Sequence, residues 1–255
     1  MEADDDRFDR QKRIAGWNQE AVEQQKIMVV GAGALGNEVV KLLLQIGVKK
    51  IALVDYDSVV KANLNRCLFF SEEDAKNRVL KVEAIAREAR KIAADAQIKA
   101  IARNVEELPE DAWNKFDFVF SCLDNLGARI HINAHSYGKA VLIDGGTTGF
   151  MGKVQVVRAP SSCLECGLSK RDYAFLWRKY NCVGEVVDWI DPKMPALATT
   201  TSIIASIQVN EFMKICHGLK SLEGKYLFFD GLSGQSKVYE VMKRKDCPAH
   251  PTLSA

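Results

Sequence analysis

The stretch Lys26–Val40, KIMVVGAGALGNEVV, decides the fold. Four apolar residues, Ile27–Val30, lead directly into Gly31, Gly33 and Gly36. A short apolar run is typical of a buried strand. Glycines spaced G-x-G-x-x-G let the backbone turn tightly and approach a phosphate at the N-terminus of a helix. The stretch therefore predicts a strand, a turn and a helix that bind a nucleotide, but it does not decide between a dinucleotide and a triphosphate.

Short apolar runs and helical patterns alternate along the first 150 residues. We expect further strands at 51–54, 98–102, 116–121 and 141–144, and helices at 17–24, 35–45, 81–93 and 128–137. Strands that are apolar throughout indicate a parallel sheet with both faces covered. Residues 1–150 are therefore predicted to form the nucleotide-binding half of an α/β, Rossmann-like doubly wound fold.

The pattern changes after residue 150. Period-two runs at 152–157 and 237–242 predict antiparallel strands that extend the same sheet, and 201–217 has a helical pattern. Between them, Lys170–Ala198 shows no period, and we expect it to be a long crossing loop. We predict a single domain over 1–255, in which 151–255 supplies a cysteine-containing knuckle, the crossing loop and the sheet extension.

Composition excludes several classes of protein. The formal net charge of +2 gives no support for a nucleic-acid surface. No apolar run approaches the roughly 18 residues of a membrane span, and the acidic N-terminus is unlike a signal peptide. Seven cysteines, an odd and unevenly spread number, indicate reduced thiols in a cytoplasmic protein.

Charged side chains around the glycine turn favour ATP over a dinucleotide. Asp55 lies 19 residues after Gly36, the spacing of an acid that binds a ribose hydroxyl, and this fits NAD and ATP equally well. A triphosphate carries more negative charge than the pyrophosphate of a dinucleotide, so additional cations favour it. The candidates that could supply them are Arg7, Arg10, Arg66 and Lys81.

Asp124 follows the apolar strand expected at 116–121. Ligands of this fold bind beyond the carboxyl ends of the strands, and Mg²⁺ prefers carboxylate and phosphate oxygens. Asp124 is therefore a candidate magnesium ligand. The alternative is a helix N-cap for Asn125 onward, a role that an aspartate also fills.

Two cysteine-containing pairs predict a zinc site. Cys163 and Cys166 form a C-x-x-C, and Cys247 and His250 form a C-x-x-H near the other end of the sequence. Two such pairs are typical of a structural Zn²⁺ site with Cys₃His ligation. The alternative for the second pair is an incidental cysteine and histidine in a frayed tail.

Several motifs in this order resemble the ThiF/MoeB/ubiquitin-activating family. They are RFDRQ (7–11), VVGAGALG (29–36), LVDYD (53–57), NLNR (63–66), LKVEA (80–84), SCLDNLGAR (121–129) and CLEC (163–166). The resemblance implies that Mg-ATP is used to adenylate the C-terminal glycine of a ubiquitin-like protein, within a homodimer or pseudo-dimer. Family members usually carry a second C-x-x-C where this sequence has His250, a change that preserves the number of ligands.

The resemblance also implies roles for individual residues. Gly31, Gly33 and Asp55 would hold the adenosine, with Gly36 and Asp57 in the same motifs. Asn63, Arg66 and Lys81 would hold the phosphates, and Asp124 would hold Mg²⁺. Arg10 resembles the arginine that reaches the triphosphate bound by the partner subunit.

Cys182, in KYNCVGE, is the candidate nucleophile, because relatives carry a cysteine in this area that forms a thioester or receives sulfur. The alternative is a small buried hydrophobic residue. We expect ubiquitin-like conjugation, in which a thioester on Cys182 passes to a conjugating enzyme. The alternative within the family is adenylation of a sulfur-carrier protein ending in Gly-Gly. The alternative outside it is an NAD(P)-dependent oxidoreductase or a nucleotide-sensing protein.

Overall fold

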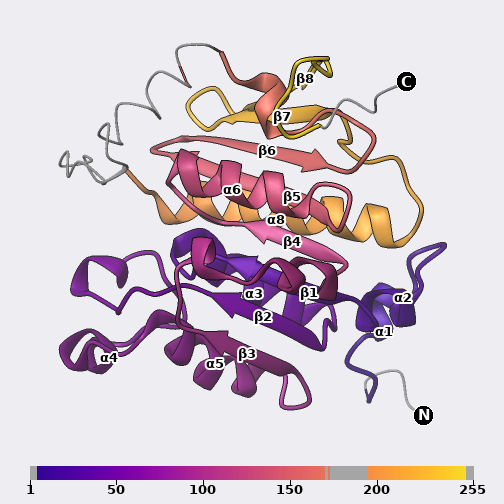
Figure 1. Ribbon diagram of the computed structural model, residues 1–255. Coiled ribbons are helices and arrows are strands. Elements are labelled where there is room, and N and C mark those ends of the chain that lie inside the picture. Colours follow the sequence, from indigo (N-terminus) through magenta and orange to yellow (C-terminus); the bar gives the residue numbers. More distant parts are fainter. Residues whose placement is uncertain (1–4, 170–171, 173–194, 251–255) are drawn as a thin grey trace, which may run out of the picture.

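A computed structural model describes residues 5–169, 172 and 195–250. In these ranges one eight-stranded sheet has the order β3-β2-β1-β4-β5-β6-β7-β8. Its strands are β1 Lys26–Val30, β2 Lys50–Val54, β3 Gln97–Ile101, β4 Phe118–Ser121, β5 Val141–Thr148, β6 Met151–Val157, β7 Lys225–Asp230 and β8 Gln235–Glu240. The first five are parallel and β6–β8 are antiparallel (Figure 1). The predicted parallel sheet with an antiparallel extension is confirmed.

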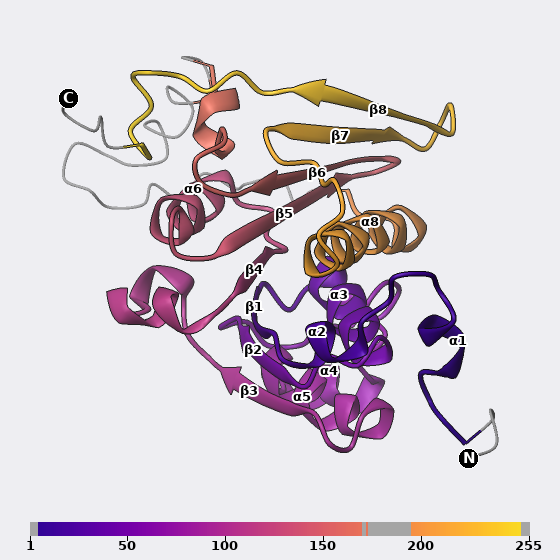
Figure 2. The same ribbon diagram turned by 90° about the vertical axis from the view of Figure 1, so that its right-hand side faces the viewer.

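Helices cover both faces of the parallel half. The α-helices are α1 Asp9–Lys12, α2 Gln19–Glu23, α3 Ala34–Gln45, α4 Glu72–Asn77, α5 Lys81–Ile92, α6 Leu126–Ser136 and α8 Ala198–Cys216. The 3₁₀ helices are η1 Lys61–Asn63, η2 Val105–Glu107, η3 Glu110–Lys115 and η4 Leu164–Gly167. Helices α3 and α8 pack on one face and α6 on the other (Figure 2). None of the helices in the described ranges has both the length and the apolar character needed to cross a bilayer.

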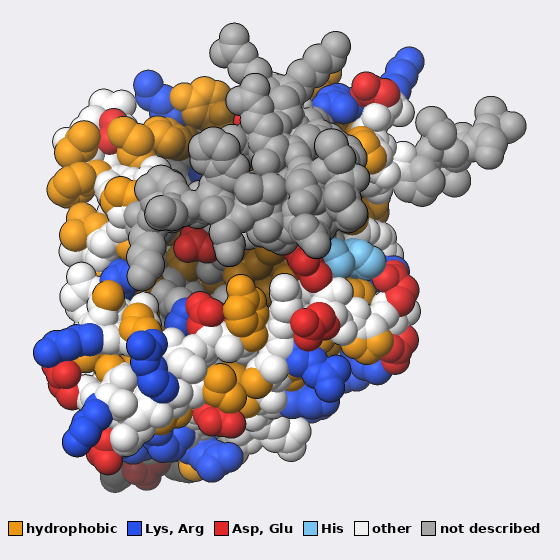
Figure 3. All heavy atoms as spheres, turned by 60° about the vertical axis from the view of Figure 1, so that its left-hand side comes forward, with side chains coloured by type: hydrophobic (Ala, Val, Ile, Leu, Met, Phe, Trp, Pro, Cys, Tyr) orange, Lys and Arg blue, Asp and Glu red, His pale blue; other side chains and the backbone are white. Residues whose placement is uncertain are grey.

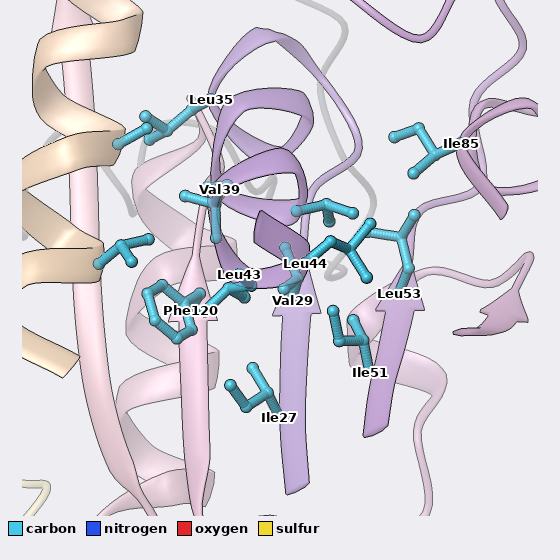
Figure 4. Packing of buried hydrophobic residues seen from close by; sticks show 14 of the residues in the cluster. Ile27, Val29, Leu35, Val39, Leu43, Leu44, Ile51, Leu53, Ile85 and Phe120 are labelled. Atoms are coloured by element: carbon cyan, nitrogen blue, oxygen red, sulfur yellow. The ribbon is translucent and has the colours of Figure 1, made fainter. Parts of the chain in front are cut away.

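Strand β1 shows why both faces are buried. Ile27 and Val29 belong to the hydrophobic core under α3, and Met28 and Val30 belong to a second core on the face of α6. Figure 4 shows the first core, where side chains of β1, β2 and β4 point toward α3. Because successive side chains of a strand point to opposite faces, a strand covered on both sides needs an unbroken apolar run.

The structure differs from expectation at several short elements, among them β7, β8 and α4. Strand β7 was not predicted, because its KYLFFD sequence does not alternate and its residues are all half-buried. Strand β8 occupies Gln235–Glu240 instead of 237–242, and all six of its residues are exposed. Helix α4 was also not predicted. It is six residues long and begins at a capping box of Ser71 and Asp74, so it has too few turns to show an apolar period.

Candidate functional site: a glycine turn and a Cys₃His cluster

The turn after β1 requires glycine at two positions. Gly31 has a φ of 98°, and a β-carbon placed there would lie 2.7 Å from the carbonyl oxygen of Cys122. A β-carbon on Gly36 would lie 1.9 Å from the carbonyl oxygen of Gly31. Glycine is therefore required for the tight turn and for the packing of α3 against it. The space beside Gly33, the N-cap residue of α3, is open: a β-carbon there would meet nothing within 4 Å.

Asp55 is fixed against this turn. Its Oδ2 accepts a hydrogen bond from the backbone N–H of Ala32 at 2.7 Å, and its Oδ1 accepts one from Asp57 N–H, also at 2.7 Å. Burial raises the pKa of the Asp55 carboxyl, and the nearby charge of Lys81 opposes that rise. Each carboxylate oxygen can accept a second hydrogen bond, so Asp55 retains capacity for a ribose hydroxyl.

Lys81 lies beside Asp57 beyond the carboxyl end of β2. Its ammonium nitrogen is 2.6 Å from Asp57 Oδ2, and its backbone N–H donates to the Asp57 carbonyl at 2.9 Å. The Lys81 side chain is 11% exposed and that of Asp57 is 53% exposed. The stem of the lysine is thus buried inside the protein, and its charged end pairs with a carboxylate at the surface.

Asn63 and Arg66 lie on the segment that follows β2. Asn63 Oδ1 accepts from the N–H of Val60 at 3.0 Å, and Arg66 donates to Asn65 Oδ1 at 2.8 Å. Figure 3 faces the side where the parallel strands end and shows lysine, arginine and acidic side chains mixed on its lower half. With both signs interspersed, any binding of phosphate must depend on individual cations, not on a broad positive surface.

Asn37 is a buried site residue that the sequence analysis missed. Its side-chain amide donates to the carbonyls of Ala32 at 3.1 Å and Gly33 at 2.9 Å, and its Oδ1 accepts from Phe69 N–H at 3.0 Å. One side chain therefore fastens the glycine turn to the segment that carries Asn63 and Arg66. The only sequence signal was an asparagine on an otherwise apolar helix face.

We expect Asn37→Ala to lower the free energy of unfolding by about 1–3 kcal/mol, because it leaves buried backbone groups unpaired. Urea denaturation measures this. Asn77→Ala, at the exposed end of α4, is the matched control and should change stability by less than about 0.5 kcal/mol. Equal effects of the two changes would contradict the role of Asn37.

Asp124 is exposed and follows β4. The alternative that it caps the next helix is wrong. Asn125 is the N-cap, and its Oδ1 accepts from the N–H groups of Gly127 and Ala128. Asp124 lies two residues after Cys122, whose carbonyl touches the glycine turn. Asp124 therefore follows β4 at the same edge of the sheet where the glycine turn follows the neighbouring strand β1, and it is not the N-cap of α6.

Arg10 is far from the glycine turn of its own chain. Two contacts hold the region of α1 at the C-terminal end of α3: Arg7 donates to the Leu44 carbonyl at 3.2 Å, and Gln11 donates to the Ile46 carbonyl at 3.0 Å. The glycine turn is at the other end of this 12-residue helix, about 18 Å away. Arg10 itself is paired with Asp9 at 2.6 Å.

The structure brings the four predicted zinc ligands together. The Cys163 sulfur lies 3.9 Å from that of Cys166 and 3.6 Å from that of Cys247, and the Cys166 sulfur lies 3.4 Å from His250 Nε2. All four ligand atoms are within 4.8 Å of one another. A tetrahedral zinc with bonds of about 2.3 Å places its sulfurs about 3.8 Å apart, so the cluster has the dimensions of a zinc site. The frayed-tail alternative is wrong.

The chemistry of these donors also suits a dication. Burial raises the pKa of the Cys163 and Cys247 thiols and lowers that of His250, which favours neutral side chains in the absence of a metal. A bound dication reverses this for cysteine, because it stabilises the thiolates. The site joins the segment after β6 to the segment after β8, which lie side by side in Figure 2.

Cys182 lies outside the described residues. Of the described cysteines away from the metal cluster, Cys67 and Cys122 are buried and Cys216 is half-buried. Burial raises the pKa of the Cys67 thiol to about 11 and that of Cys216 to about 12. These thiols are protonated near neutral pH and have the character of packing residues.

Fold and site together define an α/β protein with a glycine turn after its first strand and a buried Cys₃His cluster that has the dimensions of a metal site. The chain belongs to the ThiF family, whose profile matches residues 8–249. This family comprises adenylyltransferases and E1-like enzymes that act on ubiquitin-like or sulfur-carrier proteins, and membership implies ATP and Mg²⁺ as cofactors.

Similar proteins include both a sulfur-carrier adenylyltransferase and E1-like activating enzymes. The chain is 25% identical to sulfur carrier protein ThiS adenylyltransferase of Escherichia coli K12, covering 92% of this chain and 89% of that protein. It is 33% identical to SUMO-activating enzyme subunit 2 of Dictyostelium discoideum, over 55% of this chain. It is 32% identical to the NEDD8-activating enzyme E1 catalytic subunit of Caenorhabditis elegans, over 59% of this chain. The chain spans only 22% and 38% of the lengths of the last two.

Solved structures confirm the fold. The crystal structure of E. coli MccB with ATP matches 97% of this chain and 75% of that chain, with a TM-score of 0.75 and 18% sequence identity. MccB with succinimide matches 98% of this chain and 74% of that chain, with a TM-score of 0.79 and 19% identity.

Proposed function

We propose that this protein uses ATP and Mg²⁺ to adenylate the C-terminal glycine of a ubiquitin-like or sulfur-carrier protein, and that the whole chain works as one adenylation domain. The observation that carries the proposal is the gathering of a strict glycine turn, Asp55, the Lys81–Asp57 pair and Asp124 at one edge of the sheet. An enzyme that binds a dinucleotide does not need Lys81 or Asp124 at this edge.

Each residue has a part that its contacts allow. The open space beside Gly33 admits the nucleotide, and Asp55 accepts from the ribose hydroxyls. Lys81 is placed to exchange its contact with Asp57 for a phosphate oxygen, and Asn63 and Arg66 contact the phosphates from the neighbouring segment. Asp124 holds Mg²⁺, which neutralises phosphate charge when bound.

The reaction needs cations more than a base. A carboxylate oxygen of the terminal glycine attacks the α-phosphorus of ATP, the bond from that phosphorus to the β-phosphate oxygen breaks, and pyrophosphate leaves with the electron pair. The nucleophile is already an anion, so no proton has to be removed. Lys81 and Arg66 stabilise the charge that grows on pyrophosphate.

Members of the family differ in the step that follows adenylation. We propose that Cys182 accepts the acyl group as a thioester, releasing AMP, and passes it to a conjugating enzyme. The SUMO- and NEDD8-activating relatives favour this outcome. The alternative is activation of a sulfur carrier, and it is supported by the ThiS adenylyltransferase, a relative that is matched over 89% of its own length. A covalent adduct that survives Cys182→Ala would reject Cys182 as the attachment site.

ATP–pyrophosphate exchange tests the proposal. We expect exchange only when a protein ending in Gly-Gly is present, and none with the same protein shortened by its last glycine, because the attacking carboxylate then lies out of reach. Candidate substrates are the small proteins encoded beside this gene. Absence of exchange with every candidate, together with measurable NADH binding, would favour the oxidoreductase instead.

A further inference from the structure

Helix α6 contacts the metal cluster through two side chains one turn apart. Asn133 is completely buried, and its Oδ1 accepts from the backbone N–H of Leu164, the residue that follows Cys163, at 3.0 Å. Tyr137, at the C-terminal end of the same helix, lies with its ring 4.5 Å from the His250 ring. The helix that begins beside Asp124 therefore ends against the metal ligands.

The Tyr137 hydroxyl has two neighbours that restrict its proton. Its oxygen is 2.9 Å from the carbonyl oxygen of Ser161 and 3.3 Å from His250 Nδ1. A carbonyl can only accept, so the single hydroxyl proton of the tyrosine is directed to Ser161. Toward the histidine, the tyrosine oxygen can then act only as an acceptor.

We infer that Tyr137 is a positioning residue that selects the metal-binding tautomer of His250. With its Nδ1 donating to the tyrosine oxygen, the neutral imidazole carries its proton there and leaves the lone pair of Nε2 free. Nε2 is the atom 3.4 Å from the Cys166 sulfur, inside the cluster. The opposite tautomer would place a proton on Nε2, where the metal binds, and would leave the Ser161 carbonyl without the tyrosine donor.

The contact between Tyr137 and His250 follows from the ligand set of this chain, in which the fourth ligand is a histidine. A thiolate presents its lone pairs in any rotation, but an imidazole binds only in one tautomer and one ring orientation. With histidine as the fourth ligand, a hydrogen-bond acceptor behind the ring becomes necessary. Tyr137 supplies it from an element 113 residues away in the sequence.

The inference requires that zinc binds to the cluster, and one set of measurements tests the zinc site and the role of Tyr137 separately. We expect purified wild-type protein to hold one zinc per chain; if it holds none, the site itself is refuted. In competition with a chromophoric chelator, Tyr137→Phe should bind zinc about 10–100-fold more weakly. Tyr226→Phe, which removes a hydroxyl from a tyrosine stacked on Tyr239, should bind as the wild type does.

A double-mutant cycle tests the tautomer itself. In a His250→Cys background the fourth ligand has no tautomer, so Tyr137→Phe should then change zinc affinity by less than about twofold. An equal loss in both backgrounds, or no loss in either, would overturn the inference. Long-range ¹H–¹⁵N NMR of the zinc-loaded wild type should show the His250 proton on Nδ1, and a proton on Nε2 would overturn it independently.

Discussion

The variants Arg10→Ala and Lys81→Met are each expected to be nearly inactive alone. When the two are co-expressed and form mixed dimers, we expect adenylation activity to be recovered. We expect either change to lower the rate by about 10²–10³-fold, because each removes one cation from the charge that develops on pyrophosphate. Methionine preserves the packing of the Lys81 stem, which is almost fully buried.

The recovery follows from the position of α1. Arg10 lies at the end of α3 opposite to the glycine turn, so an Arg10 that contributes to catalysis does so in a second copy of the chain. In a mixed dimer, the intact Lys81 of one chain faces the intact Arg10 of the other at one of the two sites. Random pairing makes half of the dimers mixed, so about one quarter of wild-type activity is expected.

Arg13→Ala is the matched control for Arg10. Arg13 lies at the end of α1 and pairs with the same Asp9, at 2.9 Å. We expect this change to leave adenylation unaltered. Pyrophosphate exchange by the co-expressed pair, compared with each variant alone, gives the result; failure to recover activity in dimers shown to be mixed would exclude action between subunits.

The sequence analysis predicted most of the nucleotide half because its signals are local. The glycine turn, the strand before it and Asp55 lie within 30 residues, and each has a fixed geometric meaning. The strands near the edge of the sheet were harder to predict from the sequence. Strand β7 depends on pairing with β6, about 70 residues earlier, and nothing in its own sequence alternates.

The contacts that support the site could not be predicted from the sequence either, because they also join residues that are far apart in the chain. Asn37 is recognisable only when Phe69 is folded against it, and Tyr137 only when His250 is. Asp124 was ambiguous in the sequence because aspartate and asparagine are both good N-caps, and the structure gives that role to Asn125. Spacing within a motif can be read from the sequence, whereas hydrogen bonds between distant segments require the fold.

Loss of the zinc site is the second large effect that we expect. Cys163 follows β6 and Cys247 follows β8, so a metal bound at the cluster would join two segments that are separated by the sheet extension. Strand β8 is exposed on every residue and is paired only with β7 among the described strands. Without the metal, the segment after β8 is held only by contacts within the protein, among them hydrogen bonds from Lys243 to the Pro160 carbonyl and from Arg244 to the Leu168 carbonyl.

Cys247→Ser should therefore abolish stoichiometric zinc binding and lower the melting temperature. At free zinc 1,000-fold above the dissociation constant, binding stabilises the fold by about 4 kcal/mol, which corresponds to about 8–16 °C for a chain of this size. The larger hydrophobic core contains none of the four ligands, so we expect the nucleotide half to stay folded. Amide hydrogen exchange should then rise first in residues 241–250.

Cys216→Ser is the matched control, because this thiol lies at the end of α8 and is not a ligand. Elemental analysis of the purified proteins should show one zinc per chain in Cys216→Ser and almost none in Cys247→Ser. Unchanged zinc in Cys247→Ser would refute the ligand set. Loss of zinc accompanied by uniform exchange across the whole chain would instead show that the metal supports the entire fold, because the nucleotide half would then depend on it as well.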